Sequence, residues 1–290
     1  MRNSYFQWPA TLLLFSLFCC ASPAQSNLLE DMKWEPAVVT NPPNAVKLWF
    51  PVGEKLTYSV HWGIFEVATS VITTDWVTWL DGRLLLRIRY RTKSLHILDK
   101  LYPVNDLIES YIDPVTFLPV RFIKNMNEGS RREKAMIDFN HAAKTAHWRR
   151  LVKNYQDYEL PIASDTRDIP SLSYWLRKDG FLAGTTNEYE LLADDKIYKL
   201  ILRVLPEKKG VAAAEYDSIP AVRVIPEAQF EGLFVRKGKI DLKLSKGAPC
   251  MLLSMDAEVP VAKIRLRLTK IEGPQASMWA TIWPDATKDQ

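Results

Sequence analysis

The sequence predicts an all-β protein: a large, strongly curved antiparallel sheet or barrel-like β domain with one short helix. Hydrophobic and polar residues alternate with period two along many short runs, which is the pattern of strands that bury one face. Turn-forming pairs such as Asp81-Gly82 and Asp113-Pro114 separate the runs, as antiparallel hairpins require. Only one segment, near residue 170, breaks the alternation and favours a helix.

Five runs show the alternation most clearly. In each, every second residue is hydrophobic and most of the others are polar or charged, so one face is expected in the core and the other in water. The runs are Leu56–Trp62, Leu84–Arg91, Tyr198–Val204, Ile240–Leu244 and Ile264–Leu268.

The short helix is expected from about Pro170 to Lys178. Proline is favoured in a first helical turn, and Leu172, Trp175 and Leu176 are spaced for one helical face. Gly180 is expected to end the helix. We expect it to lie across the midpoint of the β structure and to plug one open side.

Residues Met1–Ser26 have the pattern of an export signal. Arg2 gives a positive start, Thr11–Ala21 is apolar, and small residues follow. A transmembrane anchor needs about 20 apolar residues, so no membrane span is expected. Lipidation at Cys19 or Cys20 stays open, although neither cysteine follows the usual small residue.

The expected organisation is a signal over residues 1–26, an extended, proline-containing tether over 27–46, and a single antiparallel β domain over 47–285. Export predicts a periplasmic protein of the bacterial envelope, with association to the outer membrane left open. A membrane-embedded outer-membrane barrel is disfavoured, because dense arginine and lysine on alternate positions would crowd a narrow lumen and the chain has no terminal aromatic strand.

The charge is mild, at +4 for the whole chain. Removing Met1–Ser26 removes only Arg2 and leaves +3, which argues against a strongly basic nucleic-acid binder. Cys250 would then be the only cysteine, so no intrachain disulfide can form. Its apolar neighbours predict a buried, inert thiol.

No catalytic, metal-binding or cofactor-binding motif is recognisable. The four histidines lack ligand spacing, and there is no nucleophile elbow or phosphate loop. We therefore expect no metal and no cofactor. A hydrolase with a site assembled from distant positions remains an alternative, with His61, Glu54 and Asp113 as its candidate residues.

Two basic stripes are the strongest functional lead. The first comprises Arg87, Arg89 and Arg91, and the second Lys263, Arg265 and Arg267. If their strands are neighbours, the stripes would form one guanidinium-rich surface able to bind phosphate or carboxylate groups. The alternative is a solvated sheet face whose charges prevent edge pairing.

Tryptophan gives a second lead, because the chain contains 10 of these residues. Trp62 and Trp175 are predicted to contact a ligand, either by lining a pocket for an acyl chain or by stacking on a sugar ring. The alternative, core filling, is favoured for most of the tryptophans.

Several segments resemble a bacterial exported family known as domain of unknown function 3108. They lie between Phe50 and Gly273 and include Phe50–Tyr58, Tyr111–Thr116, Ile169–Leu172, Glu231–Phe234 and Val261–Ile264. The resemblance implies an envelope-associated, strongly curved antiparallel β structure. It transfers no catalytic residue.

Together these features favour a non-enzymatic envelope protein that binds an amphiphile or an acidic glycan during cell-envelope assembly. An alternative is a structural module that docks on another envelope protein through an exposed strand or the Pro170 helix. The hydrolase is the third hypothesis.

Overall fold

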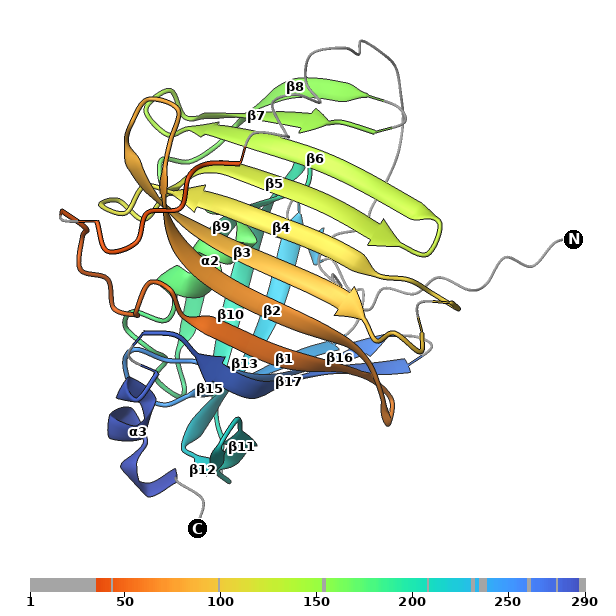
Figure 1. Ribbon diagram of the computed structural model, residues 1–290, viewed down its shortest axis with the longest axis vertical. Coiled ribbons are helices and arrows are strands. Elements are labelled where there is room, and N and C mark those ends of the chain that lie inside the picture. The colour runs from red at the N-terminus through yellow and green to blue at the C-terminus, as the bar shows by residue number, and fades with distance from the viewer. Residues whose placement is uncertain are drawn as a thin grey trace, which may run out of the picture.

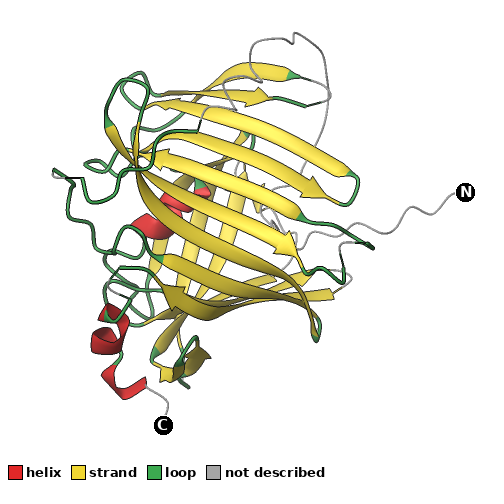
Figure 2. Ribbon diagram, in the orientation of Figure 1, coloured by secondary structure: helices red, strands yellow, loops and turns green. Residues whose placement is uncertain are grey.

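Fifteen strands of the described chain form one antiparallel sheet, which confirms the predicted fold class (Figures 1 and 2). The computed structural model describes residues 35–42, 44–98, 100–152, 155–207, 209–230, 233–234, 239–259, 262–274 and 276–286. The strands are β1 (Lys55–Trp62), β2 (Phe65–Thr78), β3 (Leu84–Ser94), β4 (Asn105–Ile112), β5 (Pro119–Glu128), β6 (Arg131–Asn140), β7 (Thr145–Arg150), β8 (Gln156–Pro161), β9 (Thr186–Ala193), β10 (Lys196–Pro206), β13 (Ala221–Phe230), β14 (Leu233–Phe234), β15 (Lys239–Ser245), β16 (Leu252–Val259) and β17 (Ala262–Glu272). β11 (Val211–Ala213) and β12 (Tyr216–Ile219) pair separately.

The strand order is β8-β7-β6-β5-β4-β3-β2-β1-β17-β16-β15-β13-β10-β9. The first eight strands form a meander of hairpins, as the closely spaced turn signals predict. The pairing of β1 with β17, in which Leu56 lies opposite Ile271, joins the two halves of the chain. All five runs predicted as strands are strands in the structure.

The sheet curls strongly but does not close by hydrogen bonds, so β8 and β9 remain its two edges. The end of the β9–β10 hairpin lies under β4–β8 (Figure 1). Its Leu192 packs with Ile108, Phe122 and Trp148 of those strands. Buried Lys124 of β5 forms an ion pair with Asp194 at the hairpin tip. Side-chain packing and this ion pair therefore hold the roll together.

Helix α2 (Ile169–Trp175) lies inside the curve of the sheet, where it packs against β3, β4 and β9 (Figure 2). It begins with a capping box in which Asp168 accepts from the backbone N–H of Ser171, at 2.8 Å. It ends earlier than the predicted range Pro170–Lys178, because the N–H of Arg177 donates to a carbonyl three residues back and tightens the chain into a turn.

A second short helix, α3 (Met278–Ile282), follows the last strand and leads into a 3₁₀ turn at Pro284–Ala286. It buries Trp279, and the following Trp283 packs on Tyr216 with ring centroids 5.1 Å apart. The sequence of α3 gives no helical signal, because five residues are too few to show a helical period.

The export signal Met1–Ser26 and the lipidation candidates Cys19 and Cys20 lie outside the described residues. Within the tether, Val39 donates its N–H to Trp76 of β2 at 2.8 Å. Within the described ranges, no helix is long and apolar enough to cross a bilayer.

Cys250 is a free, buried thiol, as expected. Burial raises its pKa to about 12, so the reactive thiolate is suppressed near neutral pH.

Candidate ligand-binding site

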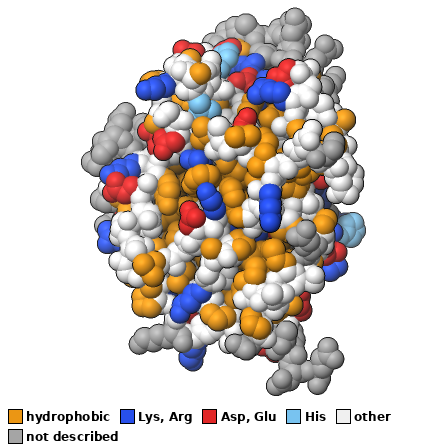
Figure 3. Space-filling model, turned by 90° about the vertical axis from the view of Figure 1, so that its left-hand side faces the viewer, with side chains coloured by type: hydrophobic (Ala, Val, Ile, Leu, Met, Phe, Trp, Pro, Cys, Tyr) orange, Lys and Arg blue, Asp and Glu red, His pale blue; other side chains and the backbone are white. Residues whose placement is uncertain are grey.

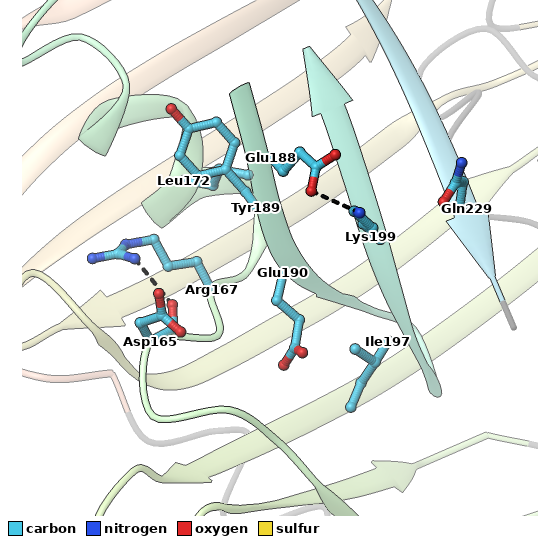
Figure 4. Close-up of a pocket in the computed structure, with 9 residues that line it drawn as sticks. All are labelled: Asp165, Arg167, Leu172, Glu188, Tyr189, Glu190, Ile197, Lys199 and Gln229. Atoms are coloured by element: carbon cyan, nitrogen blue, oxygen red, sulfur yellow. Dashed lines mark hydrogen bonds and ion pairs between the residues drawn. The ribbon is translucent and has the colours of Figure 1, made fainter. Parts of the chain in front are cut away.

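A cavity of about 490 Å³ runs along the edge of β9, next to the start of α2 (Figure 4). This volume falls in the range of small-molecule sites. The lining side chains are mostly polar or charged: Asp165, Arg167, Leu172, Glu188, Tyr189, Glu190, Ile197, Lys199 and Gln229. Because the cavity follows a strand edge, it touches side chains from both faces of β9.

Strand register brings together one wall of the cavity. Glu190 of β9 lies opposite Lys199 of β10, which lies opposite Gln229 of β13. Paired residues share a sheet face, so these three side chains form a row across three strands. Tyr189 projects to the other side of β9, toward α2 (Figure 4).

The segment that leads into α2 forms the second wall. The N–H of Leu192 donates to the carbonyl of Arg167 at 2.9 Å, which holds this segment beside β9. Glu190 reaches across and accepts from the N–H of Ala163 at 3.0 Å and from the hydroxyl of Thr166. These two hydrogen bonds tie the second wall to β9, while the guanidinium of Arg167 points away from Lys199 and Gln229 (Figure 4).

Arg167 is the distinctive group of this site, because it is only 7 % exposed and forms no ion pair with a carboxylate of the described residues. Its Nη1 donates to the backbone oxygen of Asp165 at 3.0 Å, while its Nε has no partner. The guanidinium lies 4.3 Å from the ring centroid of Trp175, a cation–π contact. Burial lowers the pKa of Arg167, and nearby Asp165 and Asp168 oppose this effect only in part.

Three of the four other charged side chains of the cavity already have partners. Glu188 and Lys199 form an ion pair at 2.6 Å, and Glu190 accepts the two bonds described above. The fourth, Asp165, is exposed, so Arg167 is the cation of this lining with unused hydrogen-bonding capacity. A guanidinium of this kind can bind a carboxylate or another oxyanion through two parallel hydrogen bonds, and the surrounding amide, phenol and carboxylates can bind hydroxyl groups.

The two predicted basic stripes do not form one surface. Their strands, β3 and β17, are separated in the sheet by β2 and β1. They are therefore not neighbours, as a joint surface would require. Carboxylates from neighbouring strands also neutralise them. Arg87 is buried and binds Asp75 at 3.0 Å. Arg265 and Arg267 share Asp256, at 3.0 and 3.4 Å.

The remaining stripe residues differ in environment. Arg89 binds Glu109 and Glu35, whereas Arg91 and Lys263 are exposed. The two predicted tryptophans also separate. Trp175 lies against Arg167 beside the cavity, while Trp62 packs on the core cluster at the far end of β1.

The three hydrolase candidates do not converge. Glu54 is buried against Arg177, His61 lies near Ser59, with Nε2 3.1 Å from its hydroxyl, and Asp113 accepts from the backbone of its own turn. Glu54 and His61 lie near opposite ends of β1, roughly 20 Å apart at the rise of an extended strand. Among the described side chains, no group of His, Cys, Asp or Glu is arranged to hold a metal ion.

Sequence reasoning missed Arg167, Glu190 and Lys199. Arg167 stands in the run Asp165-Thr166-Arg167-Asp168, where two adjacent acids suggest that its charge is balanced locally. Only the tertiary structure shows that the carboxylate of Asp168 accepts a hydrogen bond from the hydroxyl of Ser110 instead, at 2.6 Å.

The comparisons with known proteins agree with the fold. A family model described as "Protein of unknown function (DUF3108)" matches residues 57–269. No curated protein matches the sequence. The chain is similar to the crystal structure of a β-barrel-like protein of domain of unknown function DUF1849 from Brucella abortus. The TM-score is 0.50 and the identity 11%, and the match covers 77% of this chain and 98% of that one. This likeness concerns the fold alone.

Proposed function

The chain belongs to the DUF3108 family of proteins of unknown function, and because that membership assigns no activity, we propose from the geometry of the cavity that the protein binds an acidic glycan. The observation that carries this proposal is Arg167, a buried guanidinium that lines a cavity of about 490 Å³ and has no carboxylate partner among the described side chains. In this proposal Arg167 receives a uronate carboxylate.

The polar lining favours a glycan over an amphiphile. Glu188, Glu190 and Gln229 offer acceptors and donors for sugar hydroxyls, and Tyr189 offers a ring for the apolar face of a sugar. An acyl chain would remove water from Gln229 and from the ion pair of Glu188 with Lys199 without offering hydrogen bonds in return, which is costly. The export pattern of Met1–Ser26 further supports this proposal, because exported proteins of the bacterial envelope encounter acidic glycans.

The test is calorimetric titration with digalacturonate and, as an uncharged counterpart, its dimethyl ester. We expect the protein to bind digalacturonate and to bind the ester at least about tenfold more weakly, since a charge-assisted hydrogen bond contributes about 1.5 to 3 kcal/mol. Arg167→Met should remove this preference for the charged sugar. The proposal fails if digalacturonate does not bind or if Arg167→Met binds it as tightly as the wild type.

A matched control removes two arginines that already have a carboxylate partner. The double variant Arg265→Gln/Arg267→Gln is expected to bind digalacturonate normally, because both side chains are engaged with Asp256. Loss of binding in this variant, with binding retained in Arg167→Met, would assign the ligand to the basic stripe of β17. Titration with dodecanoate separates the amphiphile: binding of dodecanoate without digalacturonate would overturn the glycan assignment.

A further inference from the structure

Four large hydrophobic side chains project from two loops at one end of the sheet. Ile64 and Phe65, at the β1–β2 turn, are 85 % and 67 % exposed. Ile97 and Leu101, in the β3–β4 loop, are 81 % and 82 % exposed. Exposing side chains of this size to water is unfavourable, so their concentration at adjacent loop tips calls for a partner.

The two loops are fixed side by side. The N–H of Leu95 donates to the carbonyl of Val67 at 3.0 Å, and Leu98 packs on the core cluster that contains Val67. The N–H of Gly129 in the β5–β6 turn donates to Pro103 at 2.8 Å, which ties the β3–β4 loop to a third turn. These hydrogen bonds and contacts brace the two loops, which lie at the right-hand side of Figure 1.

Three lysines lie on β3, on β17 and in the β3–β4 loop, near these tips. Lys93, Lys100 and Lys263 are exposed, and none forms an ion pair with a described carboxylate. This differs from the arginines of β3 and β17, most of which are neutralised by neighbouring strands. Two exposed carboxylates, Glu66 and Glu258, lie at the same end, so the described charged groups there favour a cationic surface only slightly.

We propose that this end of the protein, with Ile64, Phe65, Ile97 and Leu101 as its contact residues, docks on the surface of a phospholipid bilayer. The four exposed side chains stand on loops beside exposed lysines, and a fluid interface can receive such side chains without the matched contour that a rigid protein surface would need. The hydrophobic tips enter the boundary between headgroups and acyl chains, while the lysines remain among the phosphates. Attraction to anionic lipids adds to this binding.

The experiment is flotation with vesicles of phosphatidylcholine alone or with 30% phosphatidylglycerol as the added anionic lipid. The protein is expressed with its own N-terminal sequence and used in the mature form that its host produces. We expect binding to the mixed vesicles to be a few times stronger than to the neutral ones. Ile64→Ser/Phe65→Ser and Ile97→Ser/Leu101→Ser should each weaken binding about tenfold or more, because each removes two side chains from the interface.

A matched control lies at the opposite end of the sheet, which faces the viewer in Figure 3. Leu80 and Val115 are 68 % and 78 % exposed there, in the β2–β3 and β4–β5 turns. Leu80→Ser/Val115→Ser should bind vesicles as the wild type does, as should Arg167→Met, whose cavity is a separate feature. Because all these side chains are exposed, the serine variants should keep the wild-type melting temperature.

Three outcomes would overturn the proposal. They are no binding of the wild type to either vesicle, undiminished binding of both tip variants (Ile64→Ser/Phe65→Ser and Ile97→Ser/Leu101→Ser), or loss of binding in the control variant Leu80→Ser/Val115→Ser. A wild-type dimer in gel filtration that both tip variants dissociate would instead assign these residues to contact between two copies of the chain.

Discussion

Two buried arginines stand on either side of helix α2, and they have opposite environments. Arg177 is 4 % exposed and Arg167 is 7 % exposed, and each lies against an aromatic ring. Arg177 bonds to both carboxylate oxygens of Glu54, at 3.1 Å for the Nη2 contact, and its Nε donates to the carbonyl of Cys250 at 3.1 Å. Arg167 has no carboxylate partner in the part of the chain that the structure describes.

The pKa values follow the same contrast. Burial disfavours the charge of both arginines, but Glu54 outweighs this effect and raises the pKa of Arg177. For Arg167, burial prevails and lowers the pKa. A buried charge that is paired within the fold is part of the architecture, whereas one that is left unpaired at a cavity is available to a ligand.

The largest expected effect is on the paired arginine. Arg177→Met leaves the carboxylate of Glu54 buried without a partner, so we expect the free energy of unfolding to fall by about 3 to 5 kcal/mol, measured by urea denaturation. The double variant Glu54→Leu/Arg177→Met removes both charges and should recover most of this loss. A loss below about 1 kcal/mol in the single variant would show that the pair is not a structural element.

The difference between the two arginines was not visible in the sequence, although the fold was. Strands such as Ile264–Leu268 could be predicted because alternation depends on local order alone, and α2 because proline favours its first turn. The partners of a charged side chain depend on strand register instead. Arg87 looked free in the sequence, yet the pairing of β2 with β3 places Asp75 directly opposite it.

The dependence of charge partners on tertiary structure also explains why the candidate site could be predicted only in part. Trp175 was predicted as a ligand contact from its residue type; in the structure it packs on Arg167, and its contact with a ligand stays a prediction. Arg167, which carries the proposal, lies outside the alternating runs and stands between two acidic residues in the sequence. Its lack of an ion pair results from the use of Asp168 by Ser110 and Ser171, and that is a property of the packed structure.

A smaller effect of opposite sign is expected for Arg167. Arg167→Met removes a charge whose burial is not compensated, so the free energy of unfolding should rise by about 1 kcal/mol, or at least not fall. Arg203→Met, at an exposed arginine of β10 that pairs with Glu227, is the matched control and should change stability by less than about 0.5 kcal/mol. If the free energy of unfolding of Arg167→Met instead falls by about 2 kcal/mol or more, Arg167 stabilises the fold as Arg177 does.

The smallest expected effect concerns Asp168, the carboxyl next to Arg167 in the sequence. Burial raises its pKa to about 6, from an ordinary value of 3.8, although the hydrogen bonds from Ser110 and Ser171 oppose this shift. The folded protein therefore holds this proton at pH values where the unfolded chain has released it. Lowering the pH from 7 to 5 should accordingly stabilise the folded state, by about 1 kcal/mol through this group.

Asp168→Asn isolates this contribution, because asparagine is an equally good N-cap but does not titrate. Other groups change protonation over the same interval, so the wild type alone does not isolate Asp168. The gain in the free energy of unfolding on going from pH 7 to pH 5 is therefore measured in the wild type and in Asp168→Asn, and the second value is subtracted from the first. A positive difference indicates that folding favours the protonated, uncharged form of Asp168. Arg167 then has no full counter-charge at this position. A difference of zero, or a negative one, would mean that Asp168 stays ionised in the folded protein. It would then act as a counter-charge to Arg167, and the contrast with Arg177 on which the ligand site depends would be lost.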